Sequence, residues 1–337
     1  MGKSASDILI ERFLKDVDET NSLPWQRPYK CYNSVNYFSR KAYRGFNRLL
    51  LPSGQYLTRN QINQYNKTHG TDFKFKKGIV WYPIMYFNTQ EYGVSEADML
   101  GITSDIYEEG YICTDGTWRY YNIGGNSWVK RRNYLKYYYV AERKFFEDSN
   151  GNLLPDLFEG GILELTYSKP QEVFENYVNR SKVSLDMEYT GVPCYIPSLD
   201  KVCLNKYTSS EKTWFSTAFH ELAHSTGAKN RLNREGVVYK KGVSHEEKDR
   251  IYAVEECIAE IASSLCCAEC NIMDFETSAS AEYSNSVAYV QGWKKRIQDF
   301  GSSFFYICSQ ADKAFDYITG ADSESIKTEC LRRFNLL

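Results

Sequence analysis

The segment 213–227 reads TWFSTAFHELAHSTG and contains His220, Glu221 and His224 in the spacing HExxH. Residues four apart lie on one face of a helix, so the two histidines can offer imidazole nitrogens to a single metal ion. Glu221, one step round the helix, is then placed to take a proton from a water molecule at that metal. The spacing therefore predicts a helical metal site with Glu221 as its general base.

The residues around this motif predict where the helix begins and ends. Thr208-Ser209-Ser210-Glu211 is typical of a capping box at a helix start, and Gly227 is a natural stop at the other end. Between them lies an apolar flank that predicts burial of one side of the helix, formed by Trp214, Phe215, Ala218, Phe219 and Leu222.

A catalytic zinc usually has three protein ligands, and the third is expected in the apolar, helical stretch 251–265. Glu256 and Glu260 are four residues apart there, next to apolar neighbours, and buried carboxylates need a metal or hydrogen bonds to compensate them. We assign Glu256 as third ligand and Glu260 as the carboxylate that accepts a hydrogen bond from a metal-binding imidazole. His245 is the rival third ligand, and a solvated stripe that includes Glu255 is the alternative for both glutamates.

A site of this kind predicts hydrolysis of a peptide bond. The metal, zinc or another divalent ion, would polarise water and the scissile carbonyl, while Glu221 acts first as base and then as proton donor. A further hydrogen-bond donor to the developing oxyanion is expected, and Tyr252 or His245 could supply it.

Composition indicates a globular protein without a membrane anchor. The 337 residues suit two domains of ordinary size, 42% are hydrophobic, and no apolar run reaches membrane-spanning length. The N-terminus lacks the apolar core of a signal peptide, so we expect a cytoplasmic protein whose ten cysteines are reduced. Cys266, Cys267 and Cys270 are interpreted as small buried residues.

Residues 21–80 carry a strong positive charge, with eleven basic residues and the single acid Asp72, a net charge of +10. Aromatic residues are interleaved with these charges: Trp25, Tyr29, Tyr32, Tyr37, Phe38, Tyr43, Phe46 and Tyr56. Single-stranded nucleic acid needs cations for its phosphates and flat faces for its unstacked bases, so this segment predicts a site for it. The alternatives are an aromatic core under a solvated basic face, and a site for another polyanion.

Local patterns predict an α+β fold of two domains, residues 1–150 and 151–337, with residues 148–152 as the linker. Helices are expected at 7–17, 47–51 and 59–68, and strands at 79–87 and 136–143. The acidic, aromatic stretch at about 88–128 is interpreted as an insertion, either a long loop or a hairpin pair. The zincin strand beside a bound substrate is expected near 191–202, because prolines are typical of edge strands.

With both halves considered, the chain resembles the ArdC-type antirestriction proteins. In the N-terminal half the resemblance rests on the segments 23–28 (LPWQRP), 41–47 (KAYRGFN) and 56–58 (YLT). In the C-terminal half it rests on 220–227 (HELAHSTG), 231–234 (RLNR), 255–260 (EECIAE), 289–293 (YVQGW) and 311–314 (ADKA). Three positions depart from the usual pattern: Ser225 stands where tryptophan is frequent, Arg40 where glycine is common, and Tyr29 where a second tryptophan is usual.

The resemblance implies a single-stranded-DNA-binding domain followed by a zincin-like metallopeptidase domain, in a protein of a plasmid or phage that protects incoming DNA. Single-stranded DNA and a DNA-bound protein substrate are the expected partners, with no membrane. The resemblance leaves open whether the peptidase cleaves protein, and the alternative is a non-proteolytic protector with a structural or vestigial metal site. The candidate DNA contacts are Trp25, Arg27, Lys41, Tyr43, Arg44, Asn47, Arg48, Lys74, Lys76 and Lys77.

Overall fold

The computed structural model describes residues 3–26, 34–95, 106–108, 111–113, 118–124, 127–156, 168–206, 211–238, 242, 244–272 and 280–320. Two compact units emerge from the contacts: one comprises Met1–Leu9 and Pro83–Tyr139, and the other Ile10–Tyr82 and Val140–Leu337. Residue 150 lies inside the second unit, and the functional division there remains a prediction. The predicted linker at 148–152 forms a turn, in which the Asp148 carboxylate accepts hydrogen bonds from the backbone of Asn150 and Asn152.

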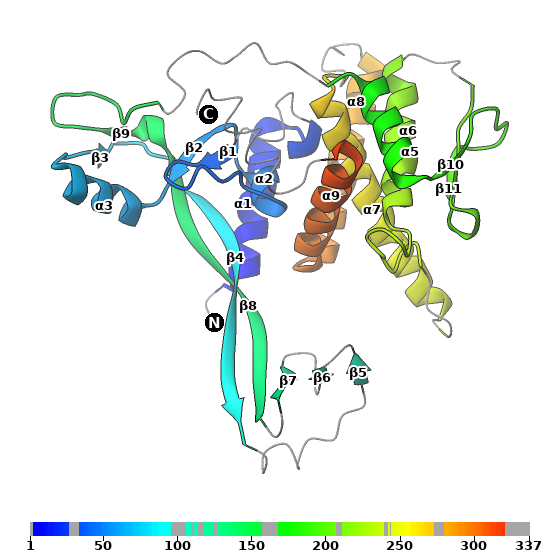
Figure 1. Ribbon diagram of the computed structural model, residues 1–337. Coiled ribbons are helices and arrows are strands. Elements are labelled where there is room, and N and C mark those ends of the chain that lie inside the picture. Colours follow the sequence, from blue (N-terminus) through cyan, green and yellow to red (C-terminus); the bar gives the residue numbers. More distant parts are fainter. Residues whose placement is uncertain are drawn as a thin grey trace. The chain divides into compact units, whose positions relative to one another are not determined.

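The first unit is built mainly from antiparallel strands (Figure 1). The long strand β4 (Tyr82–Val94) pairs with β8 (Ser127–Glu142), and β8 pairs with β7 (Arg119–Gly124). Next in order come β6 (Tyr111–Cys113) and β5 (Ile106–Glu108), each antiparallel to its neighbour. The two strands expected at 79–87 and 136–143 are thus parts of longer strands, and the described parts of the insertion are hairpins.

The N-terminal part of the second unit combines short strands with three helices. Its elements are α1 (Ala5–Thr20), η1 (Pro24–Gln26), β1 (Ser34–Asn36), α2 (Phe46–Leu50), β2 (Gly54–Leu57), α3 (Arg59–His69), β3 (Lys74–Phe75), η2 (Arg143–Phe145) and β9 (Phe146–Glu147). β2 pairs in parallel with β1 and antiparallel with the end of β8. Helix α3 begins with a capping box between Thr58 and Gln61 and ends at Gly70, whose φ of 64° suits glycine.

The C-terminal part of the same unit is a small sheet against a group of helices. The elements are α5 (Pro170–Ser181), β10 (Ser184–Asp186), β11 (Cys194–Ile196), η3 (Pro197–Leu199), β12 (Lys201–Cys203), α6 (Glu211–Thr226), α7 (His245–Glu269), α8 (Ser280–Phe300) and α9 (Ser303–Thr319). The strand order is β10-β12-β11, and α6, α7 and α9 pack against one another (Figure 1). The predicted HExxH helix is α6, although its expected cap at 208–210 lies outside the described residues.

An aromatic cluster ties the N-terminal segment to the C-terminal helices. Trp25, 1% exposed, lies edge-on to Trp293 of α8 with ring centroids 4.9 Å apart. Phe13 of α1 contacts both Trp25 and Phe304 of α9, at 6.3 and 5.4 Å. Burial of such large side chains contributes about 1.5–3 kcal/mol each. Helix α1 and the helices α8 and α9 therefore share one core.

Ion pairs join α2 to α9 beside this cluster. Arg48, 2% exposed, places Nη1 2.6 Å from Asp312 Oδ1. Arg44 pairs with the same carboxylate at 2.8 Å and also with Asp316. Buried cations are tolerated only with such partners. Arg44 and Arg48, two basic residues of the segment 21–80, are thus neutralised by acids of α9.

Two further expectations concern the membrane and the cysteines. None of the helices in the described part of the chain is both long and apolar enough to cross a membrane. The described cysteines whose side chains are placed are free thiols, namely Cys194, Cys203, Cys257, Cys266, Cys267, Cys270 and Cys308. Cys266, Cys267 and Cys270 are buried, as predicted.

Substitution Asp312→Ala is expected to lower the free energy of unfolding by about 3–5 kcal/mol, because it leaves a buried guanidinium without its nearest counter-ion. Urea denaturation followed by circular dichroism measures the loss. The matched control is Asp18→Ala, which removes an exposed partner of Lys294 and is expected to cost less than about 1 kcal/mol. Equal effects of the two substitutions would contradict the structural role given to Asp312.

Candidate metal centre

Helix α6 presents its two histidines to the same space. Its apolar flank is buried, including Phe219 and Leu222 at 0% exposure, and this burial sets the rotation of the helix. His220 and His224 then lie one turn apart, with their Nε2 atoms 3.1 Å from each other. The predicted pairing of two imidazoles on one face is therefore present in the structure.

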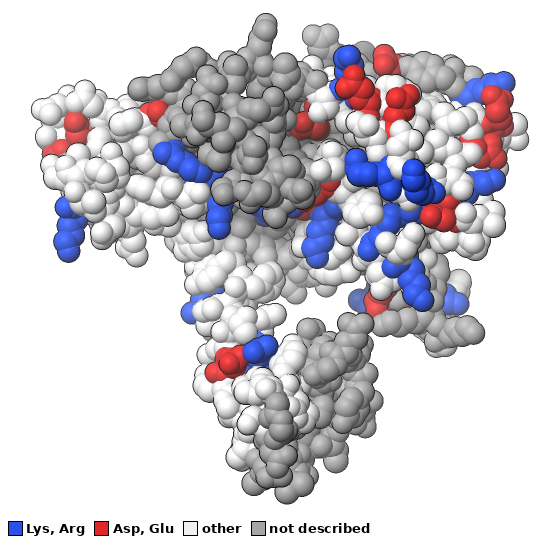
Figure 2. Space-filling model, in the orientation of Figure 1, with Lys and Arg blue, Asp and Glu red and all other residues white. Residues whose placement is uncertain are grey.

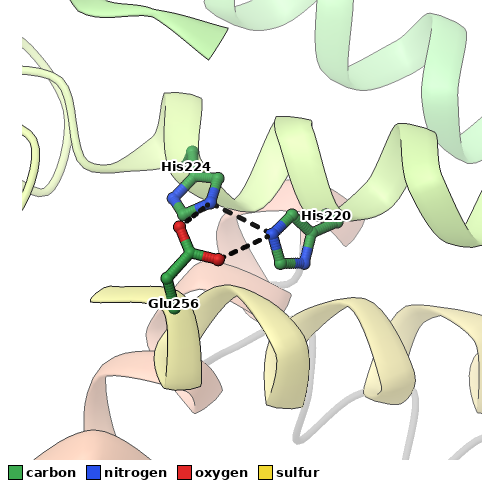
Figure 3. Close-up of side chains that lie close together, drawn as sticks. All are labelled: His220, His224 and Glu256. Atoms are coloured by element: carbon green, nitrogen blue, oxygen red, sulfur yellow. Dashed lines mark hydrogen bonds and ion pairs between the residues drawn. The ribbon is translucent and has the colours of Figure 1, made fainter. Parts of the chain in front are cut away.

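Glu256 faces both imidazoles from the neighbouring helix α7 (Figure 3). Its carboxylate oxygens lie 3.4 Å from His224 Nε2 and 3.5 Å from His220 Nε2, and one donor atom from each residue falls within 4.8 Å of the others. Ligand atoms of a tetrahedral zinc with bonds of about 2.0–2.1 Å are about 3.3 Å apart, so this donor set fits a small divalent cation. The assignment of Glu256 as a ligand remains a prediction with which this geometry agrees.

The neighbouring Glu255 is a functional residue that sequence reasoning missed. It is 2% exposed, and its Oε1 lies 3.2 Å from His224 Nδ1, while Arg234 binds both carboxylate oxygens at 2.6 and 2.9 Å. Gly236 permits this arrangement, since a Cβ there would lie 2.4 Å from the Glu255 Cβ. Glu255 therefore orients His224, a role that the sequence analysis gave to Glu260.

Glu260 is close to the other imidazole but more loosely placed. Its Oε2 lies 3.7 Å from His220 Nδ1, beyond ordinary hydrogen-bond distance, and its side chain is 38% exposed. Glu255 thus lies within hydrogen-bond distance of His224, whereas Glu260 lies farther from His220. The signal that could have pointed to Glu255 is Arg234, a buried cation that requires a buried acid.

The two candidates for an oxyanion donor differ in position. Tyr252 lies one turn before Glu256 on α7, and its hydroxyl donates a hydrogen bond to Glu256 that helps to lower the pKa of that carboxyl, after those from His220 and His224. His245 begins α7, about 16 Å along the helix from Glu256, and its side chain is 92% exposed. The structure therefore does not bring His245 to the cluster, either as ligand or as donor.

The predicted base, Glu221, is buried next to the strand expected to lie beside a substrate. Burial raises the pKa of its carboxyl, partly offset by His224, by His220 and by a hydrogen bond from the backbone of Tyr195. Tyr195 belongs to β11, which packs against α6 at the edge of the three-stranded sheet. A strand of the segment 191–202 therefore lies against α6, and its place beside a bound substrate stays a prediction. A carboxyl with a raised pKa is suited to accept and return a proton near neutral pH.

The carboxylates that face the two imidazoles also change the pKa of each ring. Burial by itself lowers the pKa of His220, but the facing carboxylates of Glu256 and Glu260 raise it to about 10. The pKa of His224 is likewise lowered by burial and raised, on balance, by Glu255 and Glu256. The cluster is thus negative enough to hold protons on its imidazoles, and a divalent cation would satisfy the same carboxylates.

Several predicted DNA contacts are not available at the surface. Trp25, Tyr43 and Arg48 are buried, and Tyr43 packs edge-on to Tyr56 at 6.3 Å. For these three side chains the expectation of a DNA contact is wrong, because each is used in packing or in a buried ion pair. Arg44 is partly exposed but pairs with two acids, and Arg27 lies outside the described residues.

The other candidates are spread over the surface of the second unit. Lys41, Lys74 and Lys77 are exposed, Asn47 is half-buried in α2, and Lys76 forms an ion pair with Glu147 at 2.8 Å. On the face drawn in Figure 2, the described Lys and Arg side chains form separate groups with Asp and Glu among them.

Substitution Glu255→Gln is expected to weaken divalent-metal binding about 10- to 100-fold, because the side chain that His224 Nδ1 faces loses its negative charge and accepts more weakly. The free energy of unfolding should fall by about 3 kcal/mol, because Arg234 keeps its charge without a partner. Isothermal titration with Mn²⁺ and urea denaturation measure the two effects. Glu246→Gln, at an exposed position in the first turn of α7, is the control, and a loss of equal size there would contradict this role of Glu255.

Comparisons with known proteins bear on the fold and on the C-terminal part of the chain. Residues 172–309 match the model of a family described as zincin-like metallopeptidase. The chain is 24% identical to the DNA primase TraC of Escherichia coli over 334 residues, 96% of this chain and 20% of that protein. It is 24% identical to the uncharacterized protein y4eC of Sinorhizobium fredii (strain NBRC 101917 / NGR234) over 152 residues, 44% of this chain and 45% of that protein. The chain thus spans less than half the length of either curated relative.

Among solved structures, the metal-free crystal structure of the antirestriction protein ArdC from plasmid R388 matches with a TM-score of 0.56 and 21% identity, covering 96% of this chain and 97% of that chain. Its Mn(II)-bound structure matches with the same score and 20% identity, covering 94% and 96%. The resemblance predicted from the sequence is confirmed: the chain has the fold of the ArdC antirestriction protein over nearly its whole length, with a zincin-like metallopeptidase domain at residues 172–309.

Proposed function

We propose that this chain is an antirestriction protein in which a single-stranded-DNA-binding part delivers a metal-dependent peptidase to protein bound on the DNA. The observation that carries the proposal is the cluster of His220, His224 and Glu256 with the buried Glu221 beside it. A purely structural metal site has no need of a buried carboxyl with a raised pKa next to its ligands. The likeness in fold to ArdC supports the antirestriction role.

The residues of the cluster divide the work as follows. His220, His224 and Glu256 would hold a divalent cation, for which zinc is proposed. Such a cation would lower the pKa of water and polarise a carbonyl group. Glu221 accepts the proton of the attacking water and returns it to the leaving amine, while Glu255 keeps His224 in orientation.

The substrate would lie along β11. This strand is at the edge of its sheet, and one of its backbone amides, that of Tyr195, already binds Glu221. An extended peptide can add to an exposed strand edge through main-chain hydrogen bonds, which brings its carbonyl groups past the catalytic residues. Binding through the backbone would accept varied side chains.

The DNA-binding part would use some of the exposed basic residues in the N-terminal part of the second unit. Lys41, Lys74 and Lys77 are exposed, and Arg59 stacks on Phe75 with its guanidinium 4.6 Å from the ring centre. Cations next to flat rings are what single strands require. The match to proteins named DNA primase and antirestriction protein supports a role on DNA.

Substitutions in the cluster should separate metal binding from catalysis. His220→Ala and Glu256→Gln are expected to lose more than about 100-fold in affinity for Zn²⁺ and Mn²⁺, since each removes a ligand. Glu221→Gln is expected to keep that affinity and to lower cleavage by about 10²- to 10⁴-fold, since it removes only the base. Isothermal titration measures the affinity, and cleavage of a denatured test protein, with and without a single strand, measures the activity.

Glu260→Gln is the matched control, because it alters a carboxylate near the cluster without removing a proposed ligand. It should reduce metal affinity by less than His220→Ala does. If Glu221→Gln leaves every activity of the wild type unchanged, including protection of DNA, the peptidase proposal fails and a non-proteolytic protector is favoured.

The double substitution Lys74→Glu and Lys77→Glu is expected to weaken binding of a single strand and to reduce its dependence on salt. Each lost phosphate contact lowers the slope of log affinity against log salt by about 0.7. Fluorescence anisotropy of a labelled oligonucleotide between low and high salt measures this slope. The double substitution Lys295→Glu and Lys313→Glu, at exposed positions of α8 and α9 outside the proposed contacts, makes the same change in net charge and is the control, and an equal loss there would refute the assignment.

A further inference from the structure

A cavity of about 630 Å³ lies between the turn that follows β1 and one face of α3. Its walls include Tyr37, Phe38 and Arg40 from the turn, and Gln64, Tyr65 and His69 from the helix. The volume is within the range of sites for small ligands, about 300–1,000 Å³. The cavity is separate from the metal centre, and the proposed peptidase does not use it.

Flat aromatic faces line the cavity. Tyr65 and His69 are one turn apart on α3 and stack with centroids 4.2 Å apart and an angle of 24° between the rings. Phe38 lies 5.7 Å from Tyr65 and 5.0 Å from Tyr37. A continuous aromatic wall of this kind is suited to a planar, unsaturated ring, which it can stack on without recognising one particular substituent.

Arg40 supplies a cation to the same cavity. Its Nη1 is buried and has no hydrogen-bond partner among the described residues, and its guanidinium lies 5.6 Å from the centre of the Tyr37 ring. Burial lowers the pKa of this guanidinium, and none of the described lining residues is acidic. A buried donor without an acceptor is costly, and an anionic oxygen of a ligand would satisfy it.

The backbone of Arg40 has a conformation that is unfavourable for a residue with a side chain. Its φ is 59°, in the left-handed region that glycine adopts readily and other residues avoid. Strained residues of this kind concentrate at functional sites, so the observed strain is consistent with a role for the arginine side chain itself.

We propose that this cavity binds one nucleotide unit, with the base against the wall of Phe38, Tyr65 and His69 and a phosphate oxygen on Arg40 Nη1. The inference rests on the proposed function, because it identifies where a single strand would place one unstacked base. The same chemistry would accept a free nucleotide, and the experiment distinguishes the two sources.

The test uses the full chain and fluorescence anisotropy with a labelled twelve-residue oligothymidylate. Arg40→Gly is expected to lower affinity for this strand at least fivefold, with the melting temperature unchanged or higher, because glycine relieves the left-handed backbone. Tyr65→Leu, which keeps an apolar side chain but removes the flat ring, is expected to lose affinity to a similar extent. Lys67→Ala removes one charge from an exposed position of α3 outside the cavity lining and should change affinity less than twofold.

A strand of the same length without bases tests stacking. The wild type is expected to prefer oligothymidylate over this abasic strand, and Tyr65→Leu should reduce that preference. In a parallel arm, saturation-transfer NMR measures binding of thymidine monophosphate. Binding of the mononucleotide that Arg40→Gly abolishes, with unchanged affinity for the strand, would support the cavity as a site for a free nucleotide.

Two negative results have different meanings. If the wild type binds the oligothymidylate, and neither Arg40→Gly nor Tyr65→Leu alters that binding or any binding of the mononucleotide, the cavity inference is overturned and the proposed function stands. If the wild type binds neither ligand, the inference and the DNA-binding part of the proposed function both fail.

Discussion

The buried carboxylate of Glu255 is the interaction on which the geometry of the candidate metal centre depends. It joins three parts of the chain: helix α7, on which it lies, Arg234 in the segment after α6, and His224 in α6. Because Glu255 points inward to these partners, the next residue along α7, Glu256, is turned toward both imidazoles. Glycine at position 236 is needed for this arrangement, because any side chain there would clash with Glu255. One buried acid thus links α7 to α6 and to the segment that follows α6.

Electrostatics in the folded chain differ from the distribution of charge along the sequence. Residues 21–80 carry a net charge of +10, yet Arg44 and Arg48 are paired with Asp312 and Asp316, which are far away in sequence. Such pairs hold the N-terminal segment on α9 and remove two cations from the set that could meet phosphate. The net charge of a basic segment therefore overstates the number of its cations that are available to a polyanion.

The aromatic residues of the same segment show why composition could not separate core from surface. Trp25 and Tyr43 are buried, whereas Phe38 and Tyr65 line a cavity. All four are rings near basic residues in the sequence, and their different fates depend on contacts with α8, α9 and α3. The small side chain of Ser225 likewise depends on its tertiary contact: it accommodates Tyr177 of α5, whose hydroxyl lies 2.5 Å from Ser225 Oγ.

Local spacing by itself determined the helices and the two histidines, because a helix repeats every 3.6 residues whatever it packs against. The residues 220 and 224, the end of α6 near Gly227 and the extent of α3 could all be predicted in this way. Tertiary structure decided which of Glu255, Glu256 and Glu260 meets which imidazole, because adjacent positions on a helix differ by about 100° and only packing selects the inward face. Tertiary structure also placed His245 far from the two metal-facing histidines and placed Arg40 in the wall of a cavity. Both positions depend on where separate segments of the chain meet.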